Sequence, residues 1–438
     1  MFSLRDIALT AFIFGMLPMI LRHPDWGILM WTWIGLMNPH RMTWGFAYSF
    51  PFAMIVGLVT LFAIFISKER KYLPLTPAVV VLLMFIAWMC ATTFLFALYP
   101  EEAQVKLIKV LKIQLFIVLT LMVMQSKERL RALILVATLS IAFFGIKGGI
   151  YTIAKGGGGK VLGPDGGFVA GNTEIALALA VTLPLMRWLQ LQTDNVWLRR
   201  AATASMVLIA ISILGSQSRG GFLAVSAMAL FLALKSRRKV LVGAFIAVAA
   251  FAMLAFMPAA WHARIDTIEN YQEDRSAMGR IGAWTFAVKI AIARPIGGGG
   301  FDTFQEGAYS RYAPEERALD SHSIWFQVLG EHGFVGLGLF LLLWLTTWRT
   351  GSWIIRKSRN DPELVWARDL AAMIQTALVA FFVGGSFLGL AYWDYPYILV
   401  AALVATRVVV ERHLREAARA EAVAGADTRR LRPQGSYV

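Results

Sequence analysis

The chain has 438 residues, of which 58% are hydrophobic and only 16% are charged. A soluble protein of this length could not cover its surface with so few charged side chains, so the composition excludes a soluble globular fold. The apolar runs are long and lack the alternation of apolar and polar residues that spanning strands show. This pattern favours membrane-spanning helices.

The charge balance is basic, with 42 Lys and Arg against 27 Asp and Glu and a net charge of +15. We interpret the excess as basic cytoplasmic loops rather than as a nucleic-acid surface, because no nucleic-acid-binding module is recognisable. The sequence therefore predicts membrane lipids as partners and no nucleic acid.

The apolar runs predict the helices that cross the bilayer. A crossing needs roughly twenty residues, which excludes the short run 26–37, and we predict that this run is re-entrant or interfacial. About twelve crossings remain, which predicts an all-α polytopic integral membrane protein with both ends of the chain cytoplasmic. The predicted crossings are residues 7–21, 51–66, 78–98, 107–124, 133–153, 173–190, 201–215, 222–234, 240–257, 324–348, 370–390 and 395–410.

The connections between these runs alternate in charge. Residues 67–72, 126–131, 197–200, 235–239 and 349–368 are basic, and the connections between them mostly are not. Because basic loops stay cytoplasmic, the alternation predicts a periplasmic location for the long polar region. The predicted domains are a membrane bundle (1–257), a large, partly helical periplasmic domain (258–321), C-terminal membrane helices (322–411) and a basic cytoplasmic tail (412–438). The tail is predicted to continue as a helix and then to become disordered.

His322 stands where the predicted periplasmic domain re-enters the membrane, shortly after Asp320. Imidazole is the side chain best suited to take a proton from a hydroxyl near neutral pH, so we consider His322 as a general base. A capping or interfacial histidine is an equally good interpretation of its position alone. His332, which follows Glu331, competes for the catalytic role.

Arg219 lies in the turn SQSRGG, on the side of the membrane where arginines are scarce. A charge there is costly and usually functional, most naturally as the partner of an anion, since no carboxylate is nearby in the sequence. The alternative is an arginine that extends to the membrane surface or pairs with a local carboxylate.

Arg280 opens a segment in which apolar residues recur at helical spacing. The pattern predicts an amphipathic helix lying on the membrane or against the domain, with Arg280 in its first turn. An arginine at this place is as compatible with a solvated face as with a site. The recurring residues are Ile281, Trp284, Val288 and Ile292.

The glycine runs 156–159 and 297–300 lie outside any Walker pattern, so ATP hydrolysis is not predicted. We predict flexible turns, with a backbone nest for an anion as the alternative. No clustered His and Cys or DxD pattern predicts a metal, and no cofactor is expected.

Several blocks of the sequence resemble a known family. RIGAW (280–284), ARPIGGGGF (293–301) and SHSIWFQVLGEHGFVGL (321–337) resemble the signature of the bacterial O-antigen ligase and polymerase superfamily, and SQSRGG (216–221) resembles its upstream turn. Ser323 stands where that family usually has Asn. The blocks 31–53 and 146–164 resemble the subgroup of exosortase-associated O-glycosylation ligases.

The resemblance implies a glycosyltransferase with a GT-C-like architecture in the bacterial inner membrane. It would transfer a glycan from undecaprenyl diphosphate to a sugar hydroxyl of lipid A-core at the periplasmic face, without a metal, and with inversion at the anomeric carbon. His322 would be the general base, and Arg219 and Arg280 would bind the diphosphate. The supporting residues would be Asp320, Ser218, Glu331 and Lys147.

Three other functions remain open at this point. An O-antigen polymerase would use the same donor with another lipid-linked glycan as acceptor. A protein O-oligosaccharyltransferase would glycosylate exported proteins. A polysaccharide or lipid transporter would need a polar path through the bundle. The charged residues that the sequence places at membrane depth cluster at one face instead.

Overall fold

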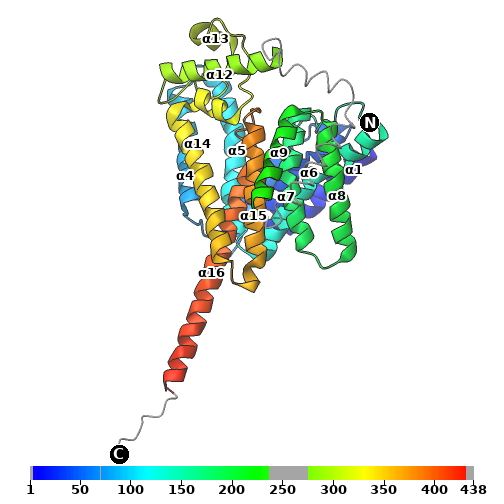
Figure 1. The fold of residues 1–438 in the computed structure, drawn as a ribbon, viewed down its shortest axis with the longest axis vertical. Helices are drawn as coiled ribbons and strands as arrows, with labels where there is room; N and C mark the ends of the chain where they lie inside the picture. The colour runs from blue at the N-terminus through cyan, green and yellow to red at the C-terminus, as the bar shows by residue number, and fades with distance from the viewer. Residues whose placement is uncertain (1–2, 70, 236–274, 431–438) are drawn as a thin grey trace, which may run out of the picture.

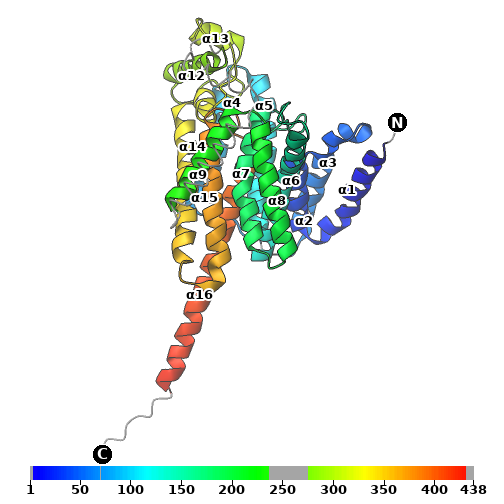
Figure 2. The same cartoon turned by 45° about the vertical axis from the view of Figure 1, so that its right-hand side comes forward.

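The computed structural model describes residues 3–69, 71–235 and 275–430. Within these ranges every regular element is a helix, and the long helices stand side by side in one bundle (Figures 1 and 2). The helices are α1 (Leu4–Arg22), α2 (Pro24–Met37), η1 (Pro39–Met42), η2 (Phe46–Tyr48), α3 (Phe52–Ile66), α4 (Pro77–Leu95), α5 (Pro100–Val123), α6 (Lys127–Ala154), α7 (Asn172–Leu191), α8 (Val196–Gly215), α9 (Arg219–Lys235), α12 (Arg275–Ala293), α13 (Glu306–Tyr312), α14 (Ile324–Lys357), η3 (Pro362–Leu364), α15 (Val365–Gly385) and α16 (Asp394–Arg430).

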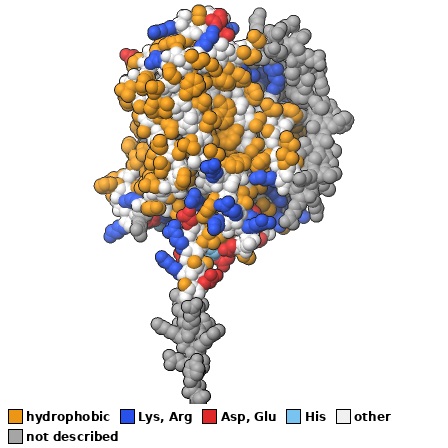
Figure 3. All heavy atoms as spheres, turned by 60° about the vertical axis from the view of Figure 1, so that its left-hand side comes forward, with side chains coloured by type: hydrophobic (Ala, Val, Ile, Leu, Met, Phe, Trp, Pro, Cys, Tyr) orange, Lys and Arg blue, Asp and Glu red, His pale blue; other side chains and the backbone are white. Residues whose placement is uncertain are grey.

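In the described part of the chain, 7 helical segments are long and apolar enough to cross a membrane. They agree with the predicted all-α polytopic membrane protein. Hydrophobic side chains cover the middle of the bundle in Figure 3, as lipid-facing helices require. The full set of about twelve crossings stays a prediction, and the predicted crossing 240–257 lies outside the described residues. The qualifying segments are α1, α4, α6, α7, α8, α14 and the unit formed by η3 and α15.

The predicted basic connections that the structure describes lie at the end of the bundle from which α16 extends (Figure 1), and residues 236–239 lie outside the described residues. Arg129, which begins α6, forms an ion pair of 2.7 Å with Glu69 in the connection after α3. Gln125 donates a hydrogen bond of 2.7 Å to the carbonyl of Tyr72 in that same connection. The short helices α12 and α13 lie at the opposite end, where α12 runs across the top of α14.

The structure contradicts the re-entrant prediction for residues 26–37, because α2, a helix of 14 residues, leads the chain back towards the start of α1. The turn between α1 and α2 lies at the basic end, where Asp25 is 3.6 Å from Arg129. The chain then returns to the start of α1, where the carboxylate of Asp6 accepts from the amides of Gly45 (3.2 Å) and Ala47 (3.1 Å). Packing against α3 and α6 gives α2 buried neighbours despite its short length.

This return also changes the predicted topology, since the start of α1 and the end of α16 now lie at opposite ends of the bundle (Figure 1). If the α12 end is periplasmic, the start of α1 is periplasmic as well. In a Cys90→Ala background, Leu4→Cys should therefore react with a membrane-impermeant maleimide in intact spheroplasts. Leu4 is 84% exposed. Lys68→Cys is the control, and it is expected to react only after lysis. The same behaviour of Leu4→Cys would restore the prediction that both ends of the chain are cytoplasmic.

The long helix α14 is broken at Gly333, where φ is 67° and ψ is −169°. The run 297–300 packs against this break: the amide of Gly299 donates to the carbonyl of Gly330 (2.9 Å), and that of Gly300 to the carbonyl of Glu331 (2.8 Å). A Cβ on Gly298 would lie 2.6 Å from the carbonyl oxygen of Gly330, so a side chain there would push the two segments apart.

Neither glycine run is an anion nest. The amides of residues 298, 299 and 300 all donate to carbonyl oxygens, and so do those of residues 156, 157 and 158 at the end of α6. Because these donors are occupied, the alternative interpretation of both runs is wrong. The run 297–300 is a closely packed support for α14.

The buried face of α12 differs from the apolar stripe read from the sequence. Ile281, Val288 and Ile292 remain exposed, whereas Phe286 and Ile290 are fully buried against α13 and its surroundings. Both faces of this helix are apolar, so periodicity alone could not select the packed one. The helix begins at Arg275, which moves Arg280 beyond the first turn.

The tail prediction is confirmed in its helical part. α16 continues without interruption from Asp394 to Arg430 and projects away from the bundle. Helix therefore extends well past the predicted start of the tail at residue 412. Residues 431–438 lie outside the described residues.

Candidate active site

A cavity of about 640 Å³ opens at the α12 end of the bundle. Its walls come from α5, the segment that leads into α7, the turn after the glycine run, the approach to α14, α14 itself and the loop before α16. Its polar lining residues are Lys106, Lys109, Glu174, Asp302, Gln305, Asp320, Ser321, His322, Gln327, Glu331 and Tyr392. The cavity thus contains His322, Asp320 and Glu331 from the predicted site.

His322 lines the cavity from the residues that directly precede α14. Its φ of 44° lies in the left-handed region, which is uncommon for a residue with a side chain and recurs at functional sites. The indole of Trp284 in α12 donates a hydrogen bond of 2.9 Å to the carbonyl of Ser321. The same indole stacks on Phe326 with ring centroids 5.1 Å apart. α12 therefore holds the segment that carries His322.

Tyr309 of α13 holds the same segment one step earlier. Its hydroxyl donates to the carbonyl of Leu319 at 2.7 Å, and its ring stacks on Phe286 at 3.9 Å. Burial raises the pKa of Tyr309 to about 12, so the phenol keeps its proton and remains a donor. The conformation before α14 is thus fixed by two aromatic donors from the polar region.

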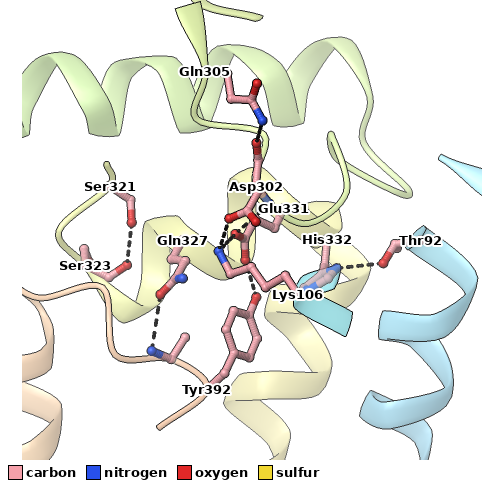
Figure 4. A network of polar contacts seen from close by, with 11 residues as sticks. Thr92, Lys106, Asp302, Gln305, Ser321, Ser323, Gln327, Glu331, His332 and Tyr392 are labelled. Atoms are coloured by element: carbon pink, nitrogen blue, oxygen red, sulfur yellow. Dashed lines mark hydrogen bonds and ion pairs between the residues drawn. The ribbon is translucent and has the colours of Figure 1, made fainter. Parts of the chain in front are cut away.

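An ionic network lines the cavity around the buried carboxylate of Glu331 (Figure 4). The ammonium of Lys106 lies 2.6 Å from Asp302 Oδ1 and 2.9 Å from Glu331 Oε1. The hydroxyl of Tyr392 donates to Glu331 Oε2 at 2.5 Å. Gln327 accepts from the amide of Ala391 at 3.2 Å. These contacts join α5, the glycine turn, α14 and the loop before α16 around the cavity.

Sequence reasoning missed Lys106, Asp302 and Tyr392. Lys106 was placed just outside the predicted crossing 107–124, although a lysine next to an apolar run is itself a signal of function. Asp302 lies two residues after the glycine run and Tyr392 lies in a short aromatic loop. No local pattern connects either residue to Glu331, since only the tertiary fold brings them together.

Arg219 and Arg280 are not among the lining residues of this cavity, and their convergence with His322 stays a prediction. The structure does bring their helices to one place. A Cβ on Gly220, which follows Arg219, would lie 4.0 Å from Phe387 Cβ. The ring of Phe387 lies 6.2 Å from that of Trp284, one helical turn beyond Arg280.

Two of the predicted supporting residues have other places. Ser218 is buried, and its hydroxyl accepts from the amide of Gly221 at 3.0 Å, so it caps the start of α9. Lys147 lines a separate cavity beside α1 and α6. Their supporting roles stay predictions, since proximity in sequence to a motif does not fix where a side chain points.

His332 lies outside the cavity lining and is fully buried. Its Nδ1 shares a hydrogen bond of 2.7 Å with the hydroxyl of Thr92, and its carbonyl accepts from the indole of Trp88 at 3.1 Å. The ring of Phe301 stands edge-on to the imidazole at 4.6 Å. These contacts suit a packing role, and they favour His322 for contact with a substrate.

Comparison with known families gives two matches. Residues 204–341 match the family model described as O-Antigen ligase. This match supports a place for the segment 204–341 in the O-antigen ligase superfamily. Residues 4–194 match a family of unknown function (DUF5935), and no curated protein matches the chain.

The O-antigen ligase match covers Arg219, Arg280, His322 and Glu331. Lys106 belongs to the region matched by the family of unknown function, and Tyr392 lies beyond both matches. The cavity is therefore assembled from the ligase segment and from both of its flanks. Neither match separates the exosortase-associated subgroup from the rest of the superfamily.

Proposed function

We propose that this protein is an O-antigen ligase that transfers a glycan from undecaprenyl diphosphate to a sugar hydroxyl of lipid A-core at the periplasmic face of the inner membrane. The observation that carries the proposal is a histidine on the wall of a polar cavity within a segment of the O-antigen ligase family. The superfamily supports ligase- or polymerase-type glycosyl transfer in general. The donor, the acceptor and the mechanism are our proposal.

The proposed reaction is one displacement at the anomeric carbon. His322 takes the proton of the acceptor hydroxyl, the acceptor oxygen bonds to the anomeric carbon, and the bond from that carbon to the diphosphate oxygen breaks. The electron pair leaves with the diphosphate, where Arg219 and Arg280 stabilise the developing negative charge. A single displacement inverts the configuration at the anomeric carbon.

The charges around the cavity support a division of labour. Its described lining includes two lysines but four carboxylates, namely Glu174, Asp302, Asp320 and Glu331. A diphosphate would be repelled by this surplus of negative charge, whereas neutral sugar hydroxyls find acceptors and donors there. The cavity therefore suits the acceptor sugar. The diphosphate would lie towards the arginines at the starts of α9 and α12.

One experiment separates the acceptors. Purified protein is mixed with a lipid-linked donor glycan and, in parallel, with rough lipopolysaccharide, with a second lipid-linked glycan or with an exported acceptor protein. The proposal expects a mass gain on lipopolysaccharide. A mass gain on the second glycan would make the protein a polymerase, and one on the protein acceptor would make it a protein O-oligosaccharyltransferase.

Each arginine can be tested separately. Arg219→Ala and Arg280→Ala should each lower kcat/KM, by an amount that corresponds to about 2 to 4 kcal/mol of lost transition-state stabilisation, as for a lost oxyanion donor. Arg219→Lys should retain more activity than Arg219→Ala but less than the wild type, because it keeps the charge and loses the two-pronged contact. Arg294→Lys is a charge-conserving control elsewhere in the polar region. Unchanged transfer by folded Arg219→Ala would remove that residue from the site.

A further inference from the structure

A second cavity, of about 870 Å³, lies between α1, α6 and the segment that joins α6 to α7. We call it the basic cavity after its four cations, Arg5, Arg41, Lys147 and Lys160. Among the described residues that line it, Asp165 is the one carboxylate. The surplus of positive charge is the opposite of the charge around His322.

These cations lie at the end of the bundle where the connections are otherwise mostly not basic. The cavity opens where α1 begins, away from the basic connections that gather around Arg129. If that end is periplasmic, loops there should be poor in Lys and Arg, because basic residues are retained in the cytoplasm. Orientation in the membrane therefore does not account for the four cations, and an anionic ligand does.

Two of the cations are held in place by aromatic rings. The guanidinium of Arg5 lies 4.2 Å from the ring centroid of Trp44, and that of Arg41 lies 4.6 Å from that of Tyr48. Stacking occupies the faces of the guanidinium groups and not their edges. One edge nitrogen of Arg5 donates to the carbonyl of Met42 at 3.3 Å. Gly166 allows Arg41 to approach, since a Cβ there would lie 3.3 Å from the guanidinium.

Part of the remaining lining is apolar and exposed. Phe143 and Leu162 are 40% and 61% exposed, and Leu9 lies beside them. Trp44, which is 77% exposed, stands at the rim. The cations suit the headgroup of an anionic lipid, and the apolar wall suits its acyl chains. Tryptophan is typical of the membrane interface between the two.

We propose that the basic cavity binds the phosphate-bearing headgroup of an anionic membrane lipid. The loop from Lys160 to Phe168 contributes to both cavities: Lys160 lines this one and Phe168 lines the His322 cavity. The proposal concerns binding alone and does not require the transfer reaction.

The test measures lipid binding to the purified full-length protein in detergent by native mass spectrometry. Short-chain phosphatidylglycerol is the probe, and phosphatidylcholine with the same chains is the zwitterionic comparison. We expect phosphatidylglycerol to bind the wild type more tightly. Lys147→Gln/Lys160→Gln should weaken phosphatidylglycerol by about thirtyfold, from the usual contribution of a cation near an anionic lipid.

The matched control is Lys68→Gln/Arg199→Gln, which removes the same charge at the other end of the bundle. All four substituted side chains are exposed, so these variants should unfold at the wild-type temperature. An equal loss in both pairs, or no loss in Lys147→Gln/Lys160→Gln, would overturn the site. If inorganic phosphate alone bound as tightly as the lipid and lost the same factor, the ligand would be free phosphate and the lipid proposal would fail.

Discussion

Replacing His322 is expected to slow glycan transfer by about 10² to 10⁴ fold while the protein remains folded and inserted. The imidazole lines the polar cavity, and the proposed reaction requires a base for the acceptor hydroxyl. The loss should appear in kcat, measured with purified protein, donor and acceptor, and donor binding should persist.

The choice of variant matters because His322 has a φ of 44°. His322→Ala adds backbone strain to the loss of the base, whereas His322→Asn tolerates this conformation and still lacks a base. Both variants should therefore lose transfer, and His322→Asn should unfold at the higher temperature. His332→Ala is the matched histidine control, expected to lose stability through a buried void and to keep more activity. If His322→Asn transferred glycan at the wild-type rate, His322 would not be the base.

Removing the cation of the buried network is expected to lower the free energy of unfolding by about 3 kcal/mol, the lower end of the range for breaking a buried ion pair. Lys106→Met leaves the carboxylate of Glu331, whose side chain is 1% exposed, without its ammonium partner. Lys106 itself keeps 25% exposure, which places the expected loss at that lower end. Equilibrium or thermal unfolding in detergent measures the change.

A second substitution separates the ion pair from general packing. Lys106→Met/Glu331→Gln should recover much of the stability, because the neutral amide no longer needs a cation and can still accept from Tyr392. Lys109→Met is the control, since this lysine lines the same cavity but stacks on Phe168 at 4.5 Å. If Lys106→Met and Lys109→Met lowered the free energy of unfolding by the same amount, the network would add little to stability.

The apolar runs of the sequence determined most of the helices, because a helix in contact with lipid requires a continuous apolar run that is visible in the local sequence. They did not determine the path of α2. A run of its length does not cross a bilayer by hydrophobicity alone, but contacts with α3 and α6 bury it within the bundle. The predicted re-entrant conformation was wrong because no residue pattern within this run predicts that α3 and α6 pack against it.

The sequence by itself also predicted His322 as a candidate base and contained the ligase-type motifs, because residues close together in the chain define the approach to α14. Only the tertiary structure decided which side chains surround that histidine. Lys106 and Glu331 are far apart in the sequence and meet at 2.9 Å, and Lys147 turned out to line the basic cavity instead. Hydrophobic periodicity indicates the buried face of a helix only where a single face is apolar, and in α12 both faces are. The partner of a buried charge depends on how separate helices pack.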